Sequence, residues 1–213
     1  VFSFLMKNDG MTFPEAARTL AGRYGIDLPT RKMSPAEKKK LTERETILTL
    51  NAEARMFFQN CLVSRSSGQK AMEYLLKRGM RKETIDTFQL GFAPDGWDHL
   101  INHLRSRKKS LEMALLAGLI VARKRGDGFY DRFRNRIVFP IFNAQNQAIG
   151  FGGRVMDDAL PKYLNSPETP VYNKSRSLYG LNTARQKCRE TGTVYVVEGY
   201  FDLLSMHQVG ITN

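Results

Sequence analysis

The hydrophobic period of the sequence changes near residue 119, and this change constrains the fold more than any other feature. Before it, apolar residues recur at helical spacing in segments that Gly or Pro separate. After it, short segments rich in β-branched and aromatic residues have the composition of strands. The sequence therefore predicts an α+β fold, in which a helical segment precedes a mixed α/β part.

The expected helices cover residues 1–7, 12–23, 41–63, 69–77, 82–88, 97–107, 111–117, 178–189 and 200–209. The expected strands cover residues 119–122, 136–142, 147–155 and, as a buried strand, 193–197. We expect Trp97 and the other aromatic residues of the first half to lie in the core.

Residues 27–40 combine two prolines with a run of three lysines, which indicates a linker between two domains. The chain starts with Val1 inside an apolar run, so we expect it to be a fragment of a longer protein. Cys61 and Cys188 show no metal or redox spacing, which is typical of reduced packing residues in a cytosolic protein. No apolar run approaches transmembrane length.

The net charge is +12, and its distribution along the chain is uneven. Residues 119–189 hold 13 Lys and Arg against five Asp and Glu, whereas residues 190–213 hold three acids and no Lys or Arg. A basic stretch beside an acidic tail suits a polyanion held next to a cation site. A soluble protein with a high isoelectric point would show the same overall charge.

The first candidate cluster is the basic segment 131–136. Arg132, Arg134 and Arg136 alternate along it, so an extended backbone would place them on one face of a strand. Arginine matches phosphate groups bidentately. A solvated edge strand protected by charge explains this cluster slightly better on its own.

The second cluster, residues 149–154, carries three glycines in a predicted strand and ends at Arg154. Glycine weakens a strand unless another backbone or a ligand approaches closely. Arg154 would then be a phosphate ligand. A β-bulge with a surface arginine is an equally good explanation.

The third cluster, residues 161–170, contains three prolines, so it is neither a helix nor a central strand. Lys162, Tyr163 and Asn165 offer a charge for phosphate, a ring for stacking and an amide for a ribose or base edge. Lys174 and Arg176 follow and add positive charge. We interpret this segment as a functional loop.

The fourth cluster follows the expected strand 193–197. Glu198 would lie at the carboxyl end of that strand, and Asp202 in the first turn of the next helix. Carboxylates there could hold Mg²⁺. Asp202 is equally well explained by favourable placement at a helix N-terminus.

Five motifs resemble bacterial DnaG-type DNA primases, and they occur in the order found in that family. They are DRFRNRIVFP at 131–140, IGFGGR at 149–154, PKYLNSPET at 161–169, LYGL at 178–181 and VVEGYFD at 196–202. Residues 2–16 and 91–97 are also similar. The resemblance covers almost the whole chain.

The resemblance implies a nucleotidyltransferase that synthesises short RNA primers on single-stranded DNA. The family has a zinc-ribbon domain, an RNA polymerase domain built on a Toprim fold and a helicase-interacting domain. Residues 1–28 would be the helical tail of the zinc-binding domain, 29–40 a linker, 41–190 the N-terminal lobe of the catalytic core, and 191–213 the start of a truncated Toprim domain.

The resemblance also implies roles for single residues. Glu198 matches the Toprim glutamate, which would bind Mg²⁺ or Mn²⁺, and Asp202 follows in the same motif. The family's further acids are missing, so we expect this fragment alone to be inactive. Zn²⁺ would belong to the missing N-terminal domain. The positions implied to line the template and nucleotide groove are Arg78, Arg132, Arg134, Arg136, Arg154, Lys162, Tyr163, Asn165, Lys174 and Arg176.

The implied partners are a single-stranded DNA template, ribonucleoside triphosphates, the RNA–DNA hybrid and a replicative helicase, with no membrane. Two other functions remain open from the residues alone. One is a single-stranded DNA-binding module without an active site. The other is a different Toprim enzyme, such as a topoisomerase or a nuclease.

Overall fold

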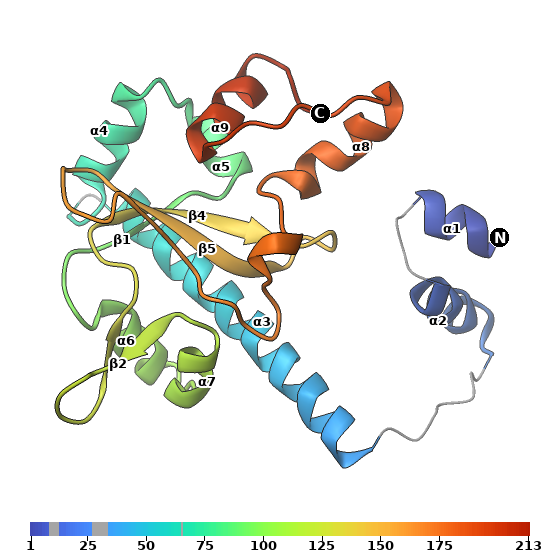
Figure 1. Ribbon diagram of the computed structural model, residues 1–213, viewed down its shortest axis with the longest axis horizontal. Helices are drawn as coiled ribbons and strands as arrows, with labels where there is room; N and C mark the ends of the chain where they lie inside the picture. The colour runs from blue at the N-terminus through green and yellow to red at the C-terminus, as the bar shows by residue number, and fades with distance from the viewer. Residues whose placement is uncertain (9–12, 27–33, 65) are drawn as a thin grey trace. The chain divides into compact units, whose positions relative to one another are not determined.

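The computed structural model describes residues 1–8, 13–26, 34–64 and 66–213 (Figure 1). Its helices are α1 (Phe2–Asn8), α2 (Phe13–Tyr24), α3 (Pro35–Val63), α4 (Gln69–Lys77), α5 (Lys82–Thr87), α6 (His99–Ser106), α7 (Leu111–Leu116), the short 3₁₀ helix η1 (Lys174–Arg176), α8 (Leu181–Thr191) and α9 (Tyr200–Gln208). Its strands are β1 (Gly91–Ala93), β2 (Ile120–Ala122), β3 (Phe129–Asp131), β4 (Arg136–Phe142), β5 (Ala148–Val155) and β6 (Tyr163–Asn165).

The chain divides into two compact units, Val1–Lys40 and Leu41–Asn213. In the first unit, α1 and α2 pack through the rings of Phe2 and Phe13, whose centroids are 5.3 Å apart. Ala16 and Ala21 are buried there. The second unit contains all six strands and all the candidate site residues.

The expected linker is wrong in its second half, because residues 35–40 form the first turns of α3. Ser34 Oγ accepts a hydrogen bond from the amide of Glu37, and Glu37 Oε2 accepts one from the amide of Ser34. This reciprocal capping box, with Pro35 at the first helical position, starts a helix despite the proline and the lysines. Residues 27–33 lie outside the described part of the chain.

A four-stranded antiparallel sheet in the order β1-β4-β5-β6 organises the second unit. The β2–β3 hairpin forms a separate two-stranded sheet. The predicted strands 136–142 and 147–155 are confirmed as β4 and β5, and 119–122 is confirmed as β2. α3 runs diagonally across the sheet (Figure 1).

Side chains alternate across the sheet and contribute to a different core cluster on each face. Val138 and Phe151 pack with Phe58 of α3, α6 and α7 on one face. Ile137 and Phe139 pack with α4, α5 and α9 on the other. β4 and β5 are therefore covered on both faces, and Figure 1 shows α4, α5 and α9 on one side of the sheet and α6 and α7 on the other.

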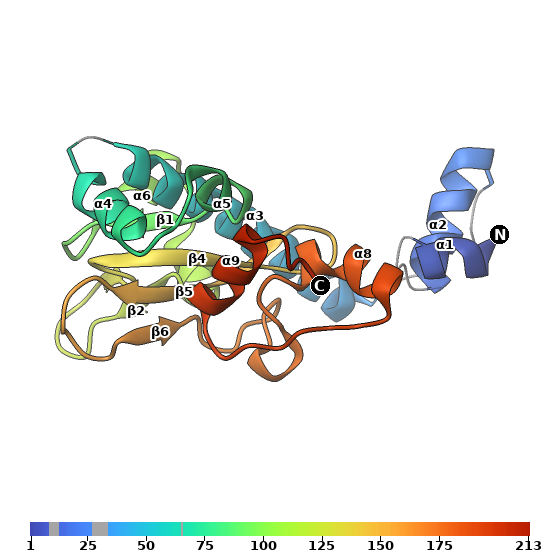
Figure 2. The same ribbon diagram turned by 90° about the horizontal axis from the view of Figure 1, so that it is seen from above.

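α9 is bound to the turn between α4 and α5 by one side chain. Gln208 Oε1 accepts a hydrogen bond from the amide of Arg81 (2.6 Å), and Gln208 Nε2 donates one to the carbonyl of Gly79 (2.9 Å). Figures 1 and 2 both place α9 beside α5. With Phe201 and Leu204 buried, α9 is part of the core of the second unit.

The expected buried strand at 193–197 is wrong. This segment forms no strand, and Val194, Tyr195 and Val196 are more than half exposed. A strand needs neighbours on its hydrogen-bonding edges, and the described residues provide one such bond, from the amide of Tyr195 to the carbonyl of Asn213. Its apolar composition indicated burial that nothing in the described chain supplies.

None of the described helices is long and apolar enough to cross a membrane.

Asp131 fixes the start of α6. Its carboxylate accepts hydrogen bonds from the amides of Leu100 (2.7 Å) and Ile101 (3.0 Å), and the side chain is buried. Burial raises the pKa of Asp131 to about 6, although the two amides lower it. The first acid of the DRFRNR motif therefore has a structural role in helix capping.

We expect Asp131→Ala to lower the free energy of unfolding by about 1–3 kcal/mol, because two buried amides lose their acceptor. The raised pKa of Asp131 means that the folded state binds its proton more tightly than the unfolded state. Protonation of Asp131 therefore adds to the free energy of unfolding. This contribution is complete below about pH 4 and is lost as the pH rises through about 6. Urea denaturation from pH 4 to 7 should show this loss in the parent and not in Asp131→Asn. If the free energy of unfolding changed with pH in the same way in the parent and in Asp131→Asn, the raised pKa of Asp131 would be contradicted.

Candidate nucleic-acid interface

Arg154 is the centre of an aromatic and basic cluster on one face of the sheet. Its Nε donates a hydrogen bond to the hydroxyl of Tyr74 (2.9 Å), and its Nη1 donates to the hydroxyl of Tyr163. The guanidinium also lies over the rings of Tyr163 (4.9 Å) and Phe201 (5.3 Å). Arg154 is only 6 % exposed, so the alternative of a surface arginine at a bulge is wrong.

Arg78 extends this cluster toward solvent. Its guanidinium lies 5.2 Å from the ring centroids of both Tyr74 and Phe201. Arg154 contacts the same two residues, because it donates a hydrogen bond to the hydroxyl of Tyr74 and lies over the ring of Phe201. Arg78 itself is exposed. Two guanidinium groups therefore contact the same two aromatic side chains, an arrangement that suits phosphate beside surfaces for base stacking.

The strand expected to carry Arg132, Arg134 and Arg136 together is wrong. Residues 132–135 are irregular, and only Arg136 belongs to a strand, because β3 ends at Asp131 and β4 begins at Arg136. The chain changes from one sheet to the other within this segment.

Arg132 and Arg136 bind main-chain carbonyls of the segment around β6. Arg132 Nε and Nη2 donate to the carbonyl of Asn165 at 3.2 and 3.0 Å. Arg136 Nη1 lies 3.5 Å from the carbonyl of Lys162, and Arg136 is 7 % exposed. Burial lowers the pKa of both guanidinium groups. Both arginines thus hold β6 in place.

Trp97 was expected in the core, and this expectation is wrong, because it is 58 % exposed. The guanidinium of Arg134 lies 4.4 Å from the Trp97 ring and 5.1 Å from the Tyr130 ring. Its Nη1 donates to the carbonyl of Asp131. The hydrophobicity of Trp97 alone could not reveal that its ring lies at the surface and binds Arg134. The polar neighbours of Trp97 in the sequence, Asp95 and Asp98, were the available signal.

The loop before β6 brings Lys162 and Tyr163 next to Arg154. Tyr163 pairs with Arg154 across the sheet and is 38 % exposed, and Lys162 is exposed. β6 is an edge strand, which agrees with the expectation that this proline-rich segment is not a central strand. Lys174 and Arg176 lie exposed in η1.

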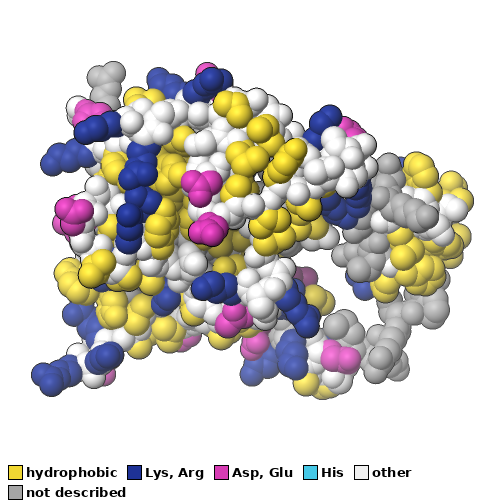
Figure 3. Space-filling model, turned by 45° about the horizontal axis from the view of Figure 1, so that its top comes forward, with side chains coloured by type: hydrophobic (Ala, Val, Ile, Leu, Met, Phe, Trp, Pro, Cys, Tyr) yellow, Lys and Arg dark blue, Asp and Glu magenta, His cyan; other side chains and the backbone are white. Residues whose placement is uncertain are grey.

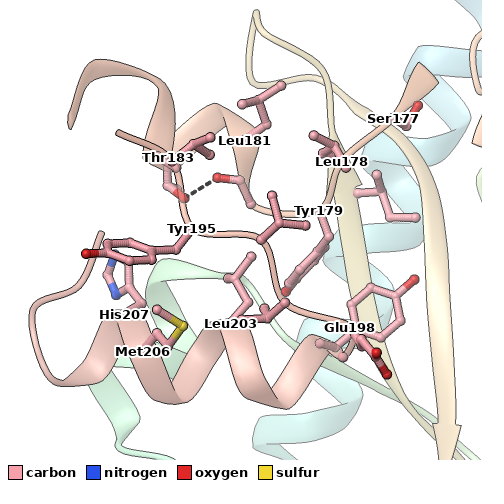
Figure 4. Close-up of a pocket in the computed structure, with 18 of the residues that line it drawn as sticks. Ser177, Leu178, Tyr179, Leu181, Thr183, Tyr195, Glu198, Leu203, Met206 and His207 are labelled. Carbon is pink, nitrogen blue, oxygen red and sulfur yellow. Dashed lines mark hydrogen bonds between the residues drawn. The ribbon is translucent and has the colours of Figure 1, made fainter. Parts of the chain in front are cut away.

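Residues between 165 and 184 and residues between 194 and 213 line most of a pocket of about 330 Å³. Asn165 and Lys174 belong to the first stretch, and Glu198, Leu203 and His207 to the second. Figure 4 shows Leu203 and Glu198 projecting from the segment around α9, with Thr183 across the pocket. Arg176 is not among its lining residues. The pocket therefore combines a cation, an amide and a carboxylate.

The two candidate acids differ in their surroundings. Glu198 is exposed and does not end a buried strand as expected. Asp202 Oδ2 accepts a hydrogen bond from the amide of Gly199 (3.1 Å), which supports helix capping as one role of Asp202. Carboxylate oxygens are ligands that Mg²⁺ prefers. Within the described residues, however, no group of three or more His, Cys, Asp or Glu side chains could hold a metal ion.

The glycines of β5 allow a close approach, but aromatic side chains make it, where the sequence indicated another backbone or a ligand. A Cβ at Gly153 would lie 2.7 Å from Cδ1 of Phe133, and a Cβ at Gly152 would collide with the ring of Tyr200. Tyr200 thereby reaches Asn165, the sheet partner of Gly152, and donates a hydrogen bond to its Oδ1 (2.9 Å). The sequence did not single out Tyr200.

Figure 3 shows one face of the molecule, on which Lys and Arg side chains gather in a column beside hydrophobic and acidic ones.

The sequence profile of the family described as "DNA primase catalytic core, N-terminal domain" matches residues 57–185, more than half of the chain. The chain belongs to this primase family.

A primase from Halalkalibacterium halodurans is 42 % identical over 212 residues, which cover 100 % of this chain and 35 % of the relative. The chain thus spans about a third of the length of the curated primases it matches. This family membership favours the DnaG-type resemblance over the topoisomerase and nuclease alternatives.

Solved primase structures have the same fold. The structure "of the DnaG primase catalytic domain bound to ssDNA" matches with a TM-score of 0.75 and 40 % identity, over 81 % of this chain and 53 % of that one. The Aquifex aeolicus primase, with "Zinc Binding and RNA Polymerase Domains", matches with a TM-score of 0.73 and 32 % identity, over 100 % of this chain and 49 % of that one. The predicted α+β fold class is confirmed.

We expect Gly153→Ala to lower the free energy of unfolding by about 1–3 kcal/mol, because the new methyl group collides with the Phe133 ring in a filled core. Gly22→Ala is the control, since no atom lies within 4 Å of its Cβ position. That variant should leave the unfolding of residues 41–213 unchanged. Urea denaturation measures both, and equal stabilities would show that β5 tolerates a side chain at 153.

Proposed function

We propose that this chain is the template- and nucleotide-binding part of a DNA primase, a nucleotidyltransferase that synthesises short RNA primers on single-stranded DNA. The observation that carries the proposal is the Arg154 cluster, in which two guanidinium groups and three aromatic rings lie beside a pocket that Glu198 lines. Basic and aromatic groups together suit single-stranded nucleic acid, and the pocket suits a nucleotide.

The template would contact the exposed side chains of Arg78, Lys162 and Tyr163, with Arg154 between them. Trp97 and Arg134 would form a second stacking surface. These contacts would be mainly to phosphate and base faces, so they would bind DNA with little sequence preference. The related catalytic domain that was solved bound to ssDNA supports this role.

The RNA–DNA hybrid and ribonucleoside triphosphates would lie between the template face and the pocket. Lys174 and Asn165 would bind the nucleotide, and Arg176 would add charge at the rim. Arg132 and Arg136 would contribute by fixing β6.

Glu198 fits Mg²⁺ or Mn²⁺ in the kind of donor it offers, although one glutamate cannot complete the site. The ion would stabilise negative charge on the nucleotide phosphates during transfer to a ribose hydroxyl. Asp202 would support Glu198 by fixing the turn at Gly199. Further carboxylates would come from beyond residue 213, so we propose that residues 1–213 alone make no primers.

The wider arrangement follows from the family. Residues 1–28 would be the tail of a zinc-binding domain, and the linker would end where α3 begins at Pro35. Residues 41–190 would be the N-terminal lobe of the catalytic core, and 191–213 the start of the Toprim domain. Zn²⁺ would be held by the preceding domain, and a replicative helicase would bind a later one. The protein would act in the cytoplasm.

The decisive experiment is templated primer synthesis by the intact protein on single-stranded DNA with ribonucleoside triphosphates and Mg²⁺. We expect synthesis by the wild type and a loss of at least about 100-fold in Glu198→Gln, because the neutral amide cannot replace a carboxylate at the ion. Residues 1–213 alone should give no product. Absence of primers from the wild-type protein would refute the proposed function.

Template binding can be tested with Lys162→Ala in the intact protein. Loss of one phosphate contact should weaken single-stranded DNA binding and reduce the slope of log affinity against log salt by about 0.7. Fluorescence anisotropy of a labelled oligonucleotide at several salt concentrations measures both. Lys82→Ala, an exposed lysine of α5, is the matched control. An equal slope in the two variants would exclude Lys162 from the DNA contact.

A further inference from the structure

Asn165 is held at its main-chain carbonyl and at its side-chain oxygen. Its main-chain carbonyl accepts hydrogen bonds from Arg132, and its side-chain Oδ1 accepts one from the hydroxyl of Tyr200. In the part of the chain that the structure describes, no protein group accepts a hydrogen bond from Nδ2. Asn165 also lines the pocket beside Lys174.

Tyr200 has little freedom to move. Its ring stacks on Phe139 with centroids 4.7 Å apart and planes 13° apart, and the ring of Tyr179 packs nearly perpendicular to it with centroids 4.7 Å apart. The ring crosses β5 where Gly152 has no side chain. The partly buried hydroxyl of Tyr200 donates its hydrogen bond to Oδ1 of Asn165.

We propose that Tyr200 is a positioning residue that fixes the orientation of the Asn165 amide in the nucleotide pocket. With Oδ1 occupied by Tyr200, Asn165 can offer the pocket only the N–H groups of Nδ2. Together with the ammonium group of Lys174, these donors select acceptor groups on the ligand, such as phosphate or ribose oxygens. This inference rests on the proposed function.

The position of Tyr200 in the chain gives this contact a second consequence. Tyr200 follows Glu198 and Gly199 directly and is the first residue of α9. The residue that orients the amide therefore also anchors the segment that carries the carboxylate. One aromatic residue thus holds the Asn165 amide and also fixes the start of the helix that follows Glu198.

The test compares two removals of a single hydroxyl from the same aromatic cluster. Tyr200→Phe keeps the ring contacts and releases the Asn165 amide, so the KM for ATP in primer synthesis by the intact protein should rise about fivefold with kcat little changed. Tyr179→Phe removes a buried hydroxyl that has no partner in the structure, and its KM should change less than about twofold.

Asn165→Asp tests whether the donor groups of the Asn165 amide bind the ligand, because it leaves the packing around the side chain nearly unchanged. It keeps an oxygen for Tyr200 and replaces the outward donor with an anionic oxygen, so its KM for ATP should rise more than that of Tyr200→Phe. Thermal denaturation of each variant should show an unchanged fold. Equal KM values in Tyr200→Phe and Tyr179→Phe, or an unchanged KM in Asn165→Asp, would overturn the inference.

ATP binding by calorimetry, measured on the same intact variants, makes this comparison without primer synthesis. Failure of the proposed function would appear in the wild type as absent synthesis. Failure of this inference would appear as equal ATP affinities among the variants.

Discussion

Two consecutive glycines in β5 are the constraint on which the second unit depends. Because side chains alternate across a sheet, Gly152 and Gly153 open opposite faces at the same place in a central strand. Phe133 fills one opening and Tyr200 the other. Aromatic side chains therefore pack against the backbone of β5 on both faces immediately before Arg154.

The candidate site is built outward from that point. Arg154 follows Gly153 and binds the phenols of Tyr74 and Tyr163, which come from α4 and β6. Buried arginine is costly unless its donors are satisfied, and the aromatic contacts with α4, β6 and α9 meet that need. A helix from early in the chain, an edge strand and the last helix thus converge on one guanidinium group. The basic face is a product of core packing as much as of surface charge.

Local signals predicted the parts of the fold that local physics determines. The strands β4 and β5 and most helices followed from composition, period and glycine positions. The prediction of a strand at 193–197 was wrong because strand pairing depends on neighbours that no local pattern reveals. The prediction that Trp97 lies in the core was wrong because the hydrophobicity of a residue does not measure its burial. The site residues could be named from the motifs, but their division into ligand-facing groups and groups such as Arg132 and Arg136 that hold the backbone required the coordinates.

The amide of Gln208 joins α9 to the carbonyl of Gly79 and the amide of Arg81, one and three residues beyond Arg78. α9 is thus held at both ends, at Tyr200 by the hydrogen bond to Asn165 and at Gln208 by the hydrogen bonds to the turn at 79–81. A shift of that turn would therefore also shift the helix that carries Asp202.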